Sequence, residues 1–282
     1  MPKGVAVGMY ASSLAYLLRP RHYAKTTFCT GFWEVPNNRK RSTEHYRRYA
    51  VGSLKLLRGA RVVVHSDTDW FIETARRVLG RDLVAVHRST PDELPMAGAA
   101  KRLLKEWKNQ DDSILTSLYD DQSRAWIEKG LIHKQRELNG SGEEAALAIL
   151  TIWLSKIQLT TDAATSCGSR VAAGGQPPWL GWIDASLSRF NHQRAKWDIR
   201  TVSPLAGRIL HYSNDMLYMA APLPINASFL FGDAPTMALL AADFAKTLEE
   251  TVESRYCHDE ETLLGLIHAR QSQLFCCIDR PT

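Results

Sequence analysis

Two spacings of apolar residues recur along the first part of the chain. Short apolar runs bounded by polar or turn residues indicate buried strands, whereas apolar residues three or four positions apart indicate amphipathic helices. This pattern predicts strands over 26–33, 61–65 and 82–86, and helices over 42–57 and 69–79. Strands and helices that alternate in this way are typical of a mostly parallel sheet flanked by helices. We therefore expect an α/β, Rossmann-type fold.

The middle of the chain interrupts this alternation. Residues 92–138 are polar and mainly helical in pattern, so we expect a helical insertion. Asn139–Gly142 is a break, and Ser141 followed by Glu144 predicts a capping box that begins a helix ending near Ser166.

The last third predicts one more strand and two helices. The strand covers 226–232, Asp233 is expected to cap the long helix after it, and a final helix reaches about His268. No internal repeat or low-complexity linker divides the chain. We expect one domain over 26–282, preceded by an N-terminal extension of residues 1–25.

The segment Pro178–Ser186 predicts a central buried strand that ends at one carboxylate, Asp184. An ionised Asp in such a place is costly unless it is paired, hydrogen-bonded or bound to a cation. Ligands of open α/β sheets bind at the carboxyl ends of strands. Asp184 is therefore a candidate site residue, and a purely structural turn-capping role stays open.

Lys156 falls on a helical stripe beside Ile149 and Ile152. A lysine in apolar surroundings often extends its ammonium group into water. The functional alternative is a phosphate-binding cation held near the Asp184 strand.

Charge and motifs narrow the class of protein. The chain has 282 residues, 45% of them hydrophobic and 23% charged, with a net charge of +5. This charge suits an anionic substrate such as a nucleotide but is small for a nucleic-acid binder. No Gly-x-Gly-x-x-Gly follows the first strand and no Gly-Lys-Ser/Thr loop occurs, which argues against a dinucleotide-binding Rossmann domain and a P-loop.

Cysteine content and hydropathy bear on location. Five cysteines without metal-ligand spacing favour a reducing compartment, so we expect a cytoplasmic protein. The apolar stretch over 4–18 is diluted by polar residues and too short to span a bilayer. We expect no transmembrane segment, and peripheral membrane association stays open.

Several blocks, in order, resemble the HtrL/YibB-like (WlaTC-type) family of bacterial proteins. They are Arg41–Tyr46 behind a Thr-x-x-Thr-Gly-Phe-Trp strand, Trp153–Ile157, Trp182–Phe190, Asn226–Gly232 and His258–Glu260. The resemblance spans roughly residues 26–277 with gaps. It implies a GT-A-like glycosyltransferase that uses a nucleoside diphosphate sugar and a glycan or small-molecule acceptor. Ser186 stands where the family usually has Gly, which predicts less space beside Asp184.

The resemblance also implies roles for individual residues. Departure of a nucleoside diphosphate requires its charge to be neutralised, by a divalent cation such as Mn²⁺ or Mg²⁺, by basic side chains, or by both. Asp184 is the candidate metal ligand, with a lower expectation for His258 as a second one. The family-like blocks supply the candidate substrate-binding residues, which are Thr30, Arg41, Tyr46, Lys156, Asp184, Ser186, Arg189 and Gly232.

Asp259 and Glu260 are the candidate catalytic carboxylates, as base at the acceptor hydroxyl. We expect Asp259, the first of the pair, to be the more critical. The structural alternative is that both stabilise the start of the final helix. Asp67-Thr68-Asp69 has the spacing of a metal-binding D-x-D motif, but its place after the second strand favours a helix cap.

Two other classes of protein stay open. One is a nucleotide-sugar-binding protein without transfer activity. The other is a nucleic-acid-binding or nucleic-acid-modifying protein, which the basic loop over 189–200 and the eight tryptophans favour. The aromatic residues fall mostly within predicted strands and helices, which argues against a base-stacking surface.

Overall fold

The computed structural model describes residues 26–110, 129–166, 177–190, 205–214, 217–218, 221–253 and 259–279. The expected N-terminal extension, His258 and most of the basic loop over 189–200 lie outside these residues.

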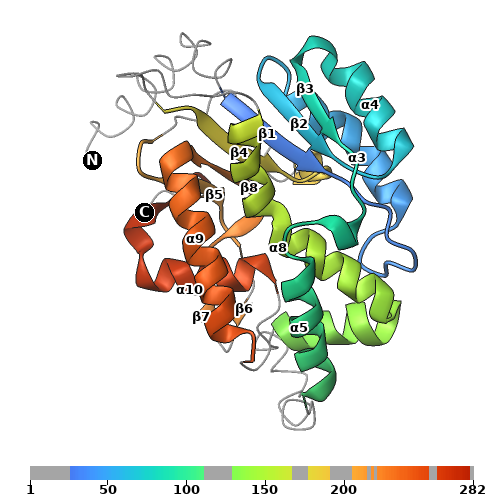
Figure 1. The fold of residues 1–282 in the computed structure, drawn as a ribbon, viewed down its shortest axis with the longest axis vertical. Helices are drawn as coiled ribbons and strands as arrows, with labels where there is room; N and C mark the ends of the chain where they lie inside the picture. Colours follow the sequence, from blue (N-terminus) through green and yellow to red (C-terminus); the bar gives the residue numbers. More distant parts are fainter. Residues whose placement is uncertain are drawn as a thin grey trace, which may run out of the picture.

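A seven-stranded sheet forms the centre of the molecule, in the order β3-β2-β1-β4-β8-β5-β9 (Figure 1). Its strands are β1 (Thr26–Gly31), β2 (Arg61–His65), β3 (Leu83–His87), β4 (Trp179–Ile183), β5 (Ile209–Tyr212), β8 (Asn226–Asp233) and β9 (Phe275–Cys277). Neighbouring strands are parallel except at β8, which is antiparallel to both β4 and β5. The predicted mostly parallel α/β sheet is confirmed. A separate small hairpin consists of β6 (Leu217–Tyr218) and β7 (Ala221–Pro222).

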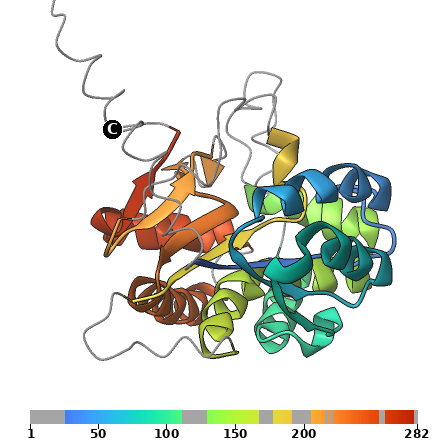
Figure 2. The same ribbon diagram turned by 90° about the horizontal axis from the view of Figure 1, so that it is seen from above.

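Helices cover both faces of this sheet (Figure 2). One face packs against α3 (Thr43–Leu56) and α4 (Asp69–Leu79). The other packs against α5 (Ala97–Asn109), α8 (Glu143–Ser166), α9 (Ala234–Thr251) and α10 (Glu260–Arg270). The short helix α7 (Lys129–His133) continues into a π-helix over Lys134–Ser141, and 3₁₀ turns occupy Gly80–Asp82, Pro91–Glu93, Leu187–Phe190 and Ser272–Leu274. None of the described helices has the length and apolarity needed to cross a membrane.

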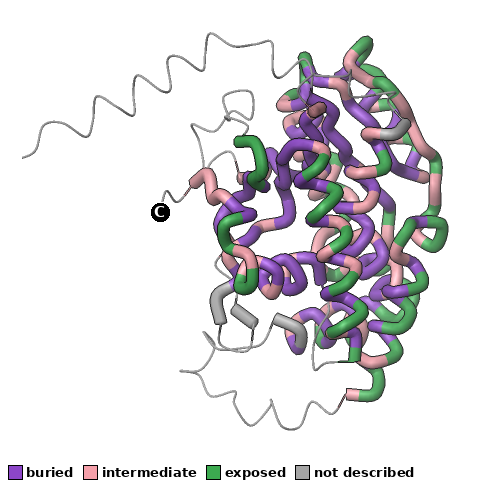
Figure 3. The backbone as a smooth tube through the Cα atoms, turned by 60° about the vertical axis from the view of Figure 1, so that its left-hand side comes forward, coloured by how far each residue is buried: buried purple, intermediate pink, exposed green. Residues whose placement is uncertain are grey.

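Alternation along the strands separates two cores. In β1, Phe28 points to the α3–α4 side, whereas Cys29 points to the α8 side. The same alternation in β4 places Leu180 and Trp182 on the α8 side. Buried residues follow the strands and the inward sides of the helices (Figure 3). Asp184, two positions after Trp182, continues that register toward α8.

Gly181 allows the two central strands to pack closely. It pairs with Phe28 of β1, and a Cβ at this position would lie 2.5 Å from the Phe28 ring and 3.0 Å from the carbonyl oxygen of Leu230. Any larger residue would push the ring or the neighbouring strand away. Glycine at this position thus permits the close packing of β4 against Phe28 of β1 and Leu230 of β8.

Helix starts agree with the sequence at some positions and differ at one. Ser42 caps α3 by accepting from the backbone N–H of His45, and Asp233 caps α9 by accepting from Thr236. The predicted capping box at Ser141 is wrong. Its hydroxyl accepts from the backbone N–H of Arg39 and donates to the carbonyl of Arg136, because the preceding π-helix turns it away from α8.

Candidate functional site

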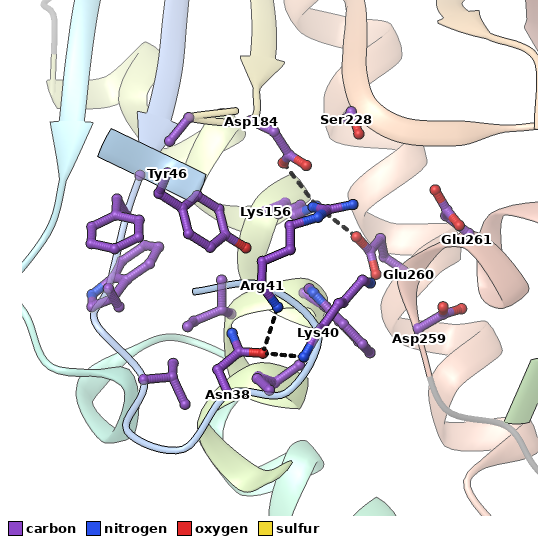
Figure 4. Close-up of a pocket in the computed structure, with 18 of the residues that line it drawn as sticks. Asn38, Lys40, Arg41, Tyr46, Lys156, Asp184, Ser228, Asp259, Glu260 and Glu261 are labelled. Carbon is purple, nitrogen blue, oxygen red and sulfur yellow. Dashed lines mark hydrogen bonds and ion pairs between the residues drawn. The ribbon is translucent and has the colours of Figure 1, made fainter. Parts of the chain in front are cut away.

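A cavity of about 300 Å³ lies where the parallel strands β1 and β4 end. Its walls are the loop after β1, the middle of α8, the first residues of β8 and the start of α10 (Figure 4). The volume is at the lower end of the range typical of small-molecule sites. Its position at the carboxyl ends of strands is the usual place for ligands in open α/β sheets.

Lys156 stands at the floor of this cavity between two carboxylates. Its ammonium Nζ lies 2.9 Å from Asp184 Oδ1 and 2.6 Å from Glu260 Oε1. Lys156 is 4% exposed and Glu260 is 5% exposed, while the side chain of Asp184 is 19% exposed, so the three charged groups form a largely buried network (Figure 4). Trp182 Nε1 donates to the same Asp184 oxygen at 2.8 Å. The network joins α8, the end of β4 and the start of α10.

The network shifts the pKa of each of its three members. Burial would raise the pKa of Asp184, but the charges of Lys156 and Arg189 outweigh it and hold the pKa well below the ordinary value. Burial would lower the pKa of Lys156, and its two carboxylate partners raise it instead. Glu260 keeps a raised pKa because burial, together with Asp259 and Glu261, outweighs the attraction of Lys156. Of the two carboxylates, Glu260 is therefore the one that takes up a proton more readily.

The start of α10 separates the two candidate catalytic carboxylates. Asp259 caps the helix, since its Oδ1 accepts from both the backbone N–H and the hydroxyl of Thr262. Its Oδ2 lies 3.4 Å from His133 Nε2. Glu260, one residue later, points to Lys156 instead (Figure 4). The geometry favours Glu260 over Asp259 as the carboxylate that acts on a bound molecule.

Glu261 ties the helix start to the sheet. Its carboxylate accepts from Asn214 Nδ2 at 2.8 Å and from the backbone N–H of Ala227 at 3.2 Å. This contact fixes α10 against the first residues of β8. Sequence reasoning did not single out Glu261, although it directly follows the candidate pair.

His133 is a second residue that the sequence did not identify. It lines the cavity, and its ring meets Trp153 edge-on at 4.8 Å between ring centres. Besides Asp259, it approaches Glu137 Oε1 at 3.7 Å. No apolar periodicity marks this position, so only the structure reveals it.

The loop after β1 forms a basic wall opposite the carboxylates. Asn38 Oδ1 accepts from the backbone N–H groups of Lys40 and Arg41, which fixes the turn that directs both side chains into the cavity (Figure 4). Lys40 Nζ lies 4.2 Å from the centre of the Trp153 ring. Among the described residues, no ion pair engages Lys40 or Arg41. This wall can therefore attract an anion.

Lys40 has an unusual protonation behaviour for a lysine. Burial is the main cause, with further repulsion from Arg41 and Arg136, and together they lower its pKa to about 7. The sequence already placed Lys40 in the basic run 39–41, but nothing in that run distinguishes it from its neighbours.

Arg189 completes the basic side of the cavity. Its guanidinium donates to Ser186 Oγ at 2.5 Å and to Ser228 Oγ at 3.1 Å, and it lies over the Phe190 ring. Burial, reinforced by Arg41, lowers its pKa to about 10, so it stays charged at neutral pH.

An aromatic pair borders the cavity on the α3 side. The rings of Tyr46 and Phe32 lie 4.9 Å apart, and both residues line the space. The two ring planes are tilted by 53° to each other, so each offers its own aromatic face. An aromatic face beside basic groups suits a nucleoside attached to phosphates.

The structure brings together most of the residues selected from the sequence. Those that line the cavity are Arg41, Tyr46, Lys156, Asp184, Arg189, Asp259 and Glu260. Three do not line it, which are Thr30, Ser186 and Gly232.

Each of these three differs from expectation for a physical reason. Thr30 is buried in β1 and shares the side of Phe28, which faces away from α8. The Ser186 hydroxyl is turned to Arg189, so it positions that cation and does not narrow the space beside Asp184. Gly232 pairs with Leu180 near the beginning of β4, at the edge opposite Asp184, because β8 runs antiparallel.

Metal-ligating geometry is not evident in the part of the chain that the structure describes. No group of three or more His, Cys, Asp or Glu side chains is arranged there to hold an ion. Thr68 is the N-cap residue of α4 and Asp69 pairs with Arg88 at 2.5 Å, so the Asp67-Thr68-Asp69 segment lies at a helix start, as predicted, and does not line the cavity.

No protein-family model, curated protein or solved structure matches this chain.

Proposed function

We propose that this protein is a glycosyltransferase that moves a sugar from a nucleoside diphosphate sugar to an acceptor hydroxyl. One observation carries the proposal. A buried Lys156–Asp184–Glu260 network faces a wall of basic side chains, at the carboxyl ends of parallel strands. Transfer from such a donor needs cations at the departing diphosphate and a carboxylate at the acceptor, and the cavity offers both.

The position of each side chain in the cavity indicates its role. Lys40, Arg41 and Arg189 contact the diphosphate, and Tyr46 packs against the nucleoside. Glu260, whose pKa is raised, accepts the proton of the acceptor hydroxyl or orients that hydroxyl. The mostly parallel sheet with one reversed strand supports the GT-A-like fold that the sequence resemblance implies.

A ligand screen by thermal shift tests this proposal. The purified protein is heated with ADP, GDP, UDP, CDP and dTDP, with the free nucleosides as controls. A ligand at ~100 times its dissociation constant adds ~2.7 kcal/mol to stability, which raises the Tm of a domain this size by roughly 5–10 °C. We expect at least one diphosphate to stabilise the protein and its nucleoside to do so much less. Failure of every diphosphate to shift the Tm would refute the proposal.

The pKa of Lys40 predicts how this binding depends on pH. The ammonium loses its proton as the pH rises through about 7, so affinity for the diphosphate should fall above that pH. A charge-assisted contact is worth ~1.5–3 kcal/mol, which corresponds to about one to two orders of magnitude in affinity. Bound phosphate raises the pKa of Lys40, so binding near pH 7–8 should take up protons, as calorimetry in buffers of different ionisation enthalpy would measure.

Two variants isolate this effect. Lys40→Arg should bind the diphosphate equally well across the same pH range, and Lys40→Met should bind weakly at every pH. Lys55→Met, at an exposed position of α3, serves as the control. The free energy of unfolding of the ligand-free protein should have the opposite pH dependence. Folded Lys40 loses its proton at about pH 7, whereas the unfolded chain keeps it up to the ordinary pKa of 10.5, so stability rises with pH above about 7. A pH profile that Lys40→Arg leaves unchanged would contradict the assignment.

A further inference from the structure

The carboxylates that would bind a divalent cation in this cavity are already engaged. Asp184 Oδ1 accepts from Lys156 Nζ at 2.9 Å and from Trp182 Nε1 at 2.8 Å. Glu260 Oε1 accepts from the same ammonium at 2.6 Å. A cation held between these two acids would have to displace the ammonium or stand next to it.

Burial makes that competition unfavourable for a metal ion. The side chain of Lys156 is 6% exposed and that of Glu260 is 7% exposed, so little water screens the repulsion between an ammonium and a dication. Each acid has one oxygen bound to the ammonium, Asp184 Oδ1 and Glu260 Oε1, so a cation between them would be left with one further oxygen from each. Hard cations need about six oxygen ligands, which is more than this pair supplies.

We infer that the ammonium of Lys156 takes the place of a divalent cation at this site, so that the protein binds nucleoside diphosphates without metal. The inference rests on the proposed function and makes it more specific. Lys156 neutralises Asp184 and Glu260 at the floor, and the donors of Lys40, Arg41 and Arg189 then receive the phosphates.

The hydrogen-bonding capacity of Lys156 supports this role. An ammonium group has three N–H donors. Asp184 and Glu260 use two of them, and Lys156 lines the cavity. The third donor is left for a phosphate oxygen in the cavity.

Two measurements on the wild-type protein test the inference. Dissociation constants for the diphosphates of the thermal-shift screen are measured by calorimetry in EDTA and in Mn²⁺. We expect binding in EDTA to be at least as tight as in Mn²⁺. Electron paramagnetic resonance of free Mn²⁺ then reports whether the protein removes the ion from solution, and we expect the signal to stay unchanged.

A variant provides the converse test. Lys156→Ala removes the ammonium and leaves two facing carboxylates, so this protein should now deplete the free Mn²⁺ signal. Lys246→Ala, at an exposed position of α9, is the matched control and should not. A folded Lys156→Ala protein that does not bind Mn²⁺ would count against the inference that the ammonium takes the place of a cation. If the variant does not fold, the wild-type measurements decide.

The outcomes separate this inference from the proposed function. Diphosphate binding that is about tenfold tighter with Mn²⁺, or ~1.4 kcal/mol, would overturn the inference and leave the glycosyltransferase proposal standing. Depletion of the free Mn²⁺ signal by the wild-type protein without nucleotide would also overturn the inference and leave the glycosyltransferase proposal standing. Absence of diphosphate binding both in EDTA and in Mn²⁺ would refute the proposed function itself.

Discussion

Lys156→Met is expected to destabilise the protein by ~3–5 kcal/mol, because two carboxylates then lose their buried counter-charge. The network that it disrupts connects α8, β4 and α10, so the loss affects the whole fold. Diphosphate affinity should also fall, by one to two orders of magnitude, since a charge-assisted contact of ~1.5–3 kcal/mol is removed. Urea denaturation measures the first effect and calorimetry the second.

A double variant separates these two effects of Lys156. Lys156→Met/Glu260→Gln also removes the charge of one of the two uncompensated carboxylates, so it should recover part of the lost stability. It should not recover diphosphate binding, because the ammonium is still missing. Lys246→Met, on the exposed face of α9, controls for the loss of a surface lysine. Equal weakening of diphosphate and nucleoside binding in Lys156→Met would show that the lysine acts through packing alone.

Glu260→Gln should leave donor affinity within the range of the wild type and lower turnover by ~10²–10⁴, the usual contribution of a general base. The amide keeps the shape and can still accept from Lys156 Nζ, but it cannot take a proton. Single-turnover transfer rates, measured once a donor is identified from the diphosphate screen, check this expectation.

Asp259→Asn is the matched comparison. Asn caps helices about as well as Asp, so stability should change by at most about 1 kcal/mol, with little loss of turnover. If Asp259→Asn lost turnover and Glu260→Gln did not, Asp259 would be the catalytic carboxylate, as the sequence alone predicts.

Local patterns were enough to predict most of the elements that support the cavity. The apolar spacing gave β2 and α4 with the observed bounds, because each is a short segment whose burial follows directly from its own residues. The stripe of Lys156 placed it on an inward face of α8. Of the two alternatives for Lys156, the one that held it near the Asp184 strand agrees with the 2.9 Å contact between Lys156 Nζ and Asp184 Oδ1.

What the sequence did not reveal depends on strand direction and on loop conformation. The period of a strand predicts which residues share a side of the sheet but not which side faces a ligand. For this reason the sequence did not reveal that Thr30 faces away from the cavity. The antiparallel course of β8, which no apolar pattern encodes, moved Gly232 to the far edge. The orientation of Lys40 follows from the Asn38 turn, and the partners of Glu260 and Asp259 follow from the capping of α10.

The reversed course of β8 makes its two ends suitable for different uses in protein engineering. Its first part carries Asn226 and Ser228, which line the cavity, whereas its last residues meet the opposite edge of the sheet. There a Cβ on Gly232 would lie 2.8 Å from Ile209, and Asp233 caps α9 and accepts from the backbone N–H of Gly207. A library that randomises the first part would sample new ligand preferences, while the unchanged last residues preserve a foldable scaffold.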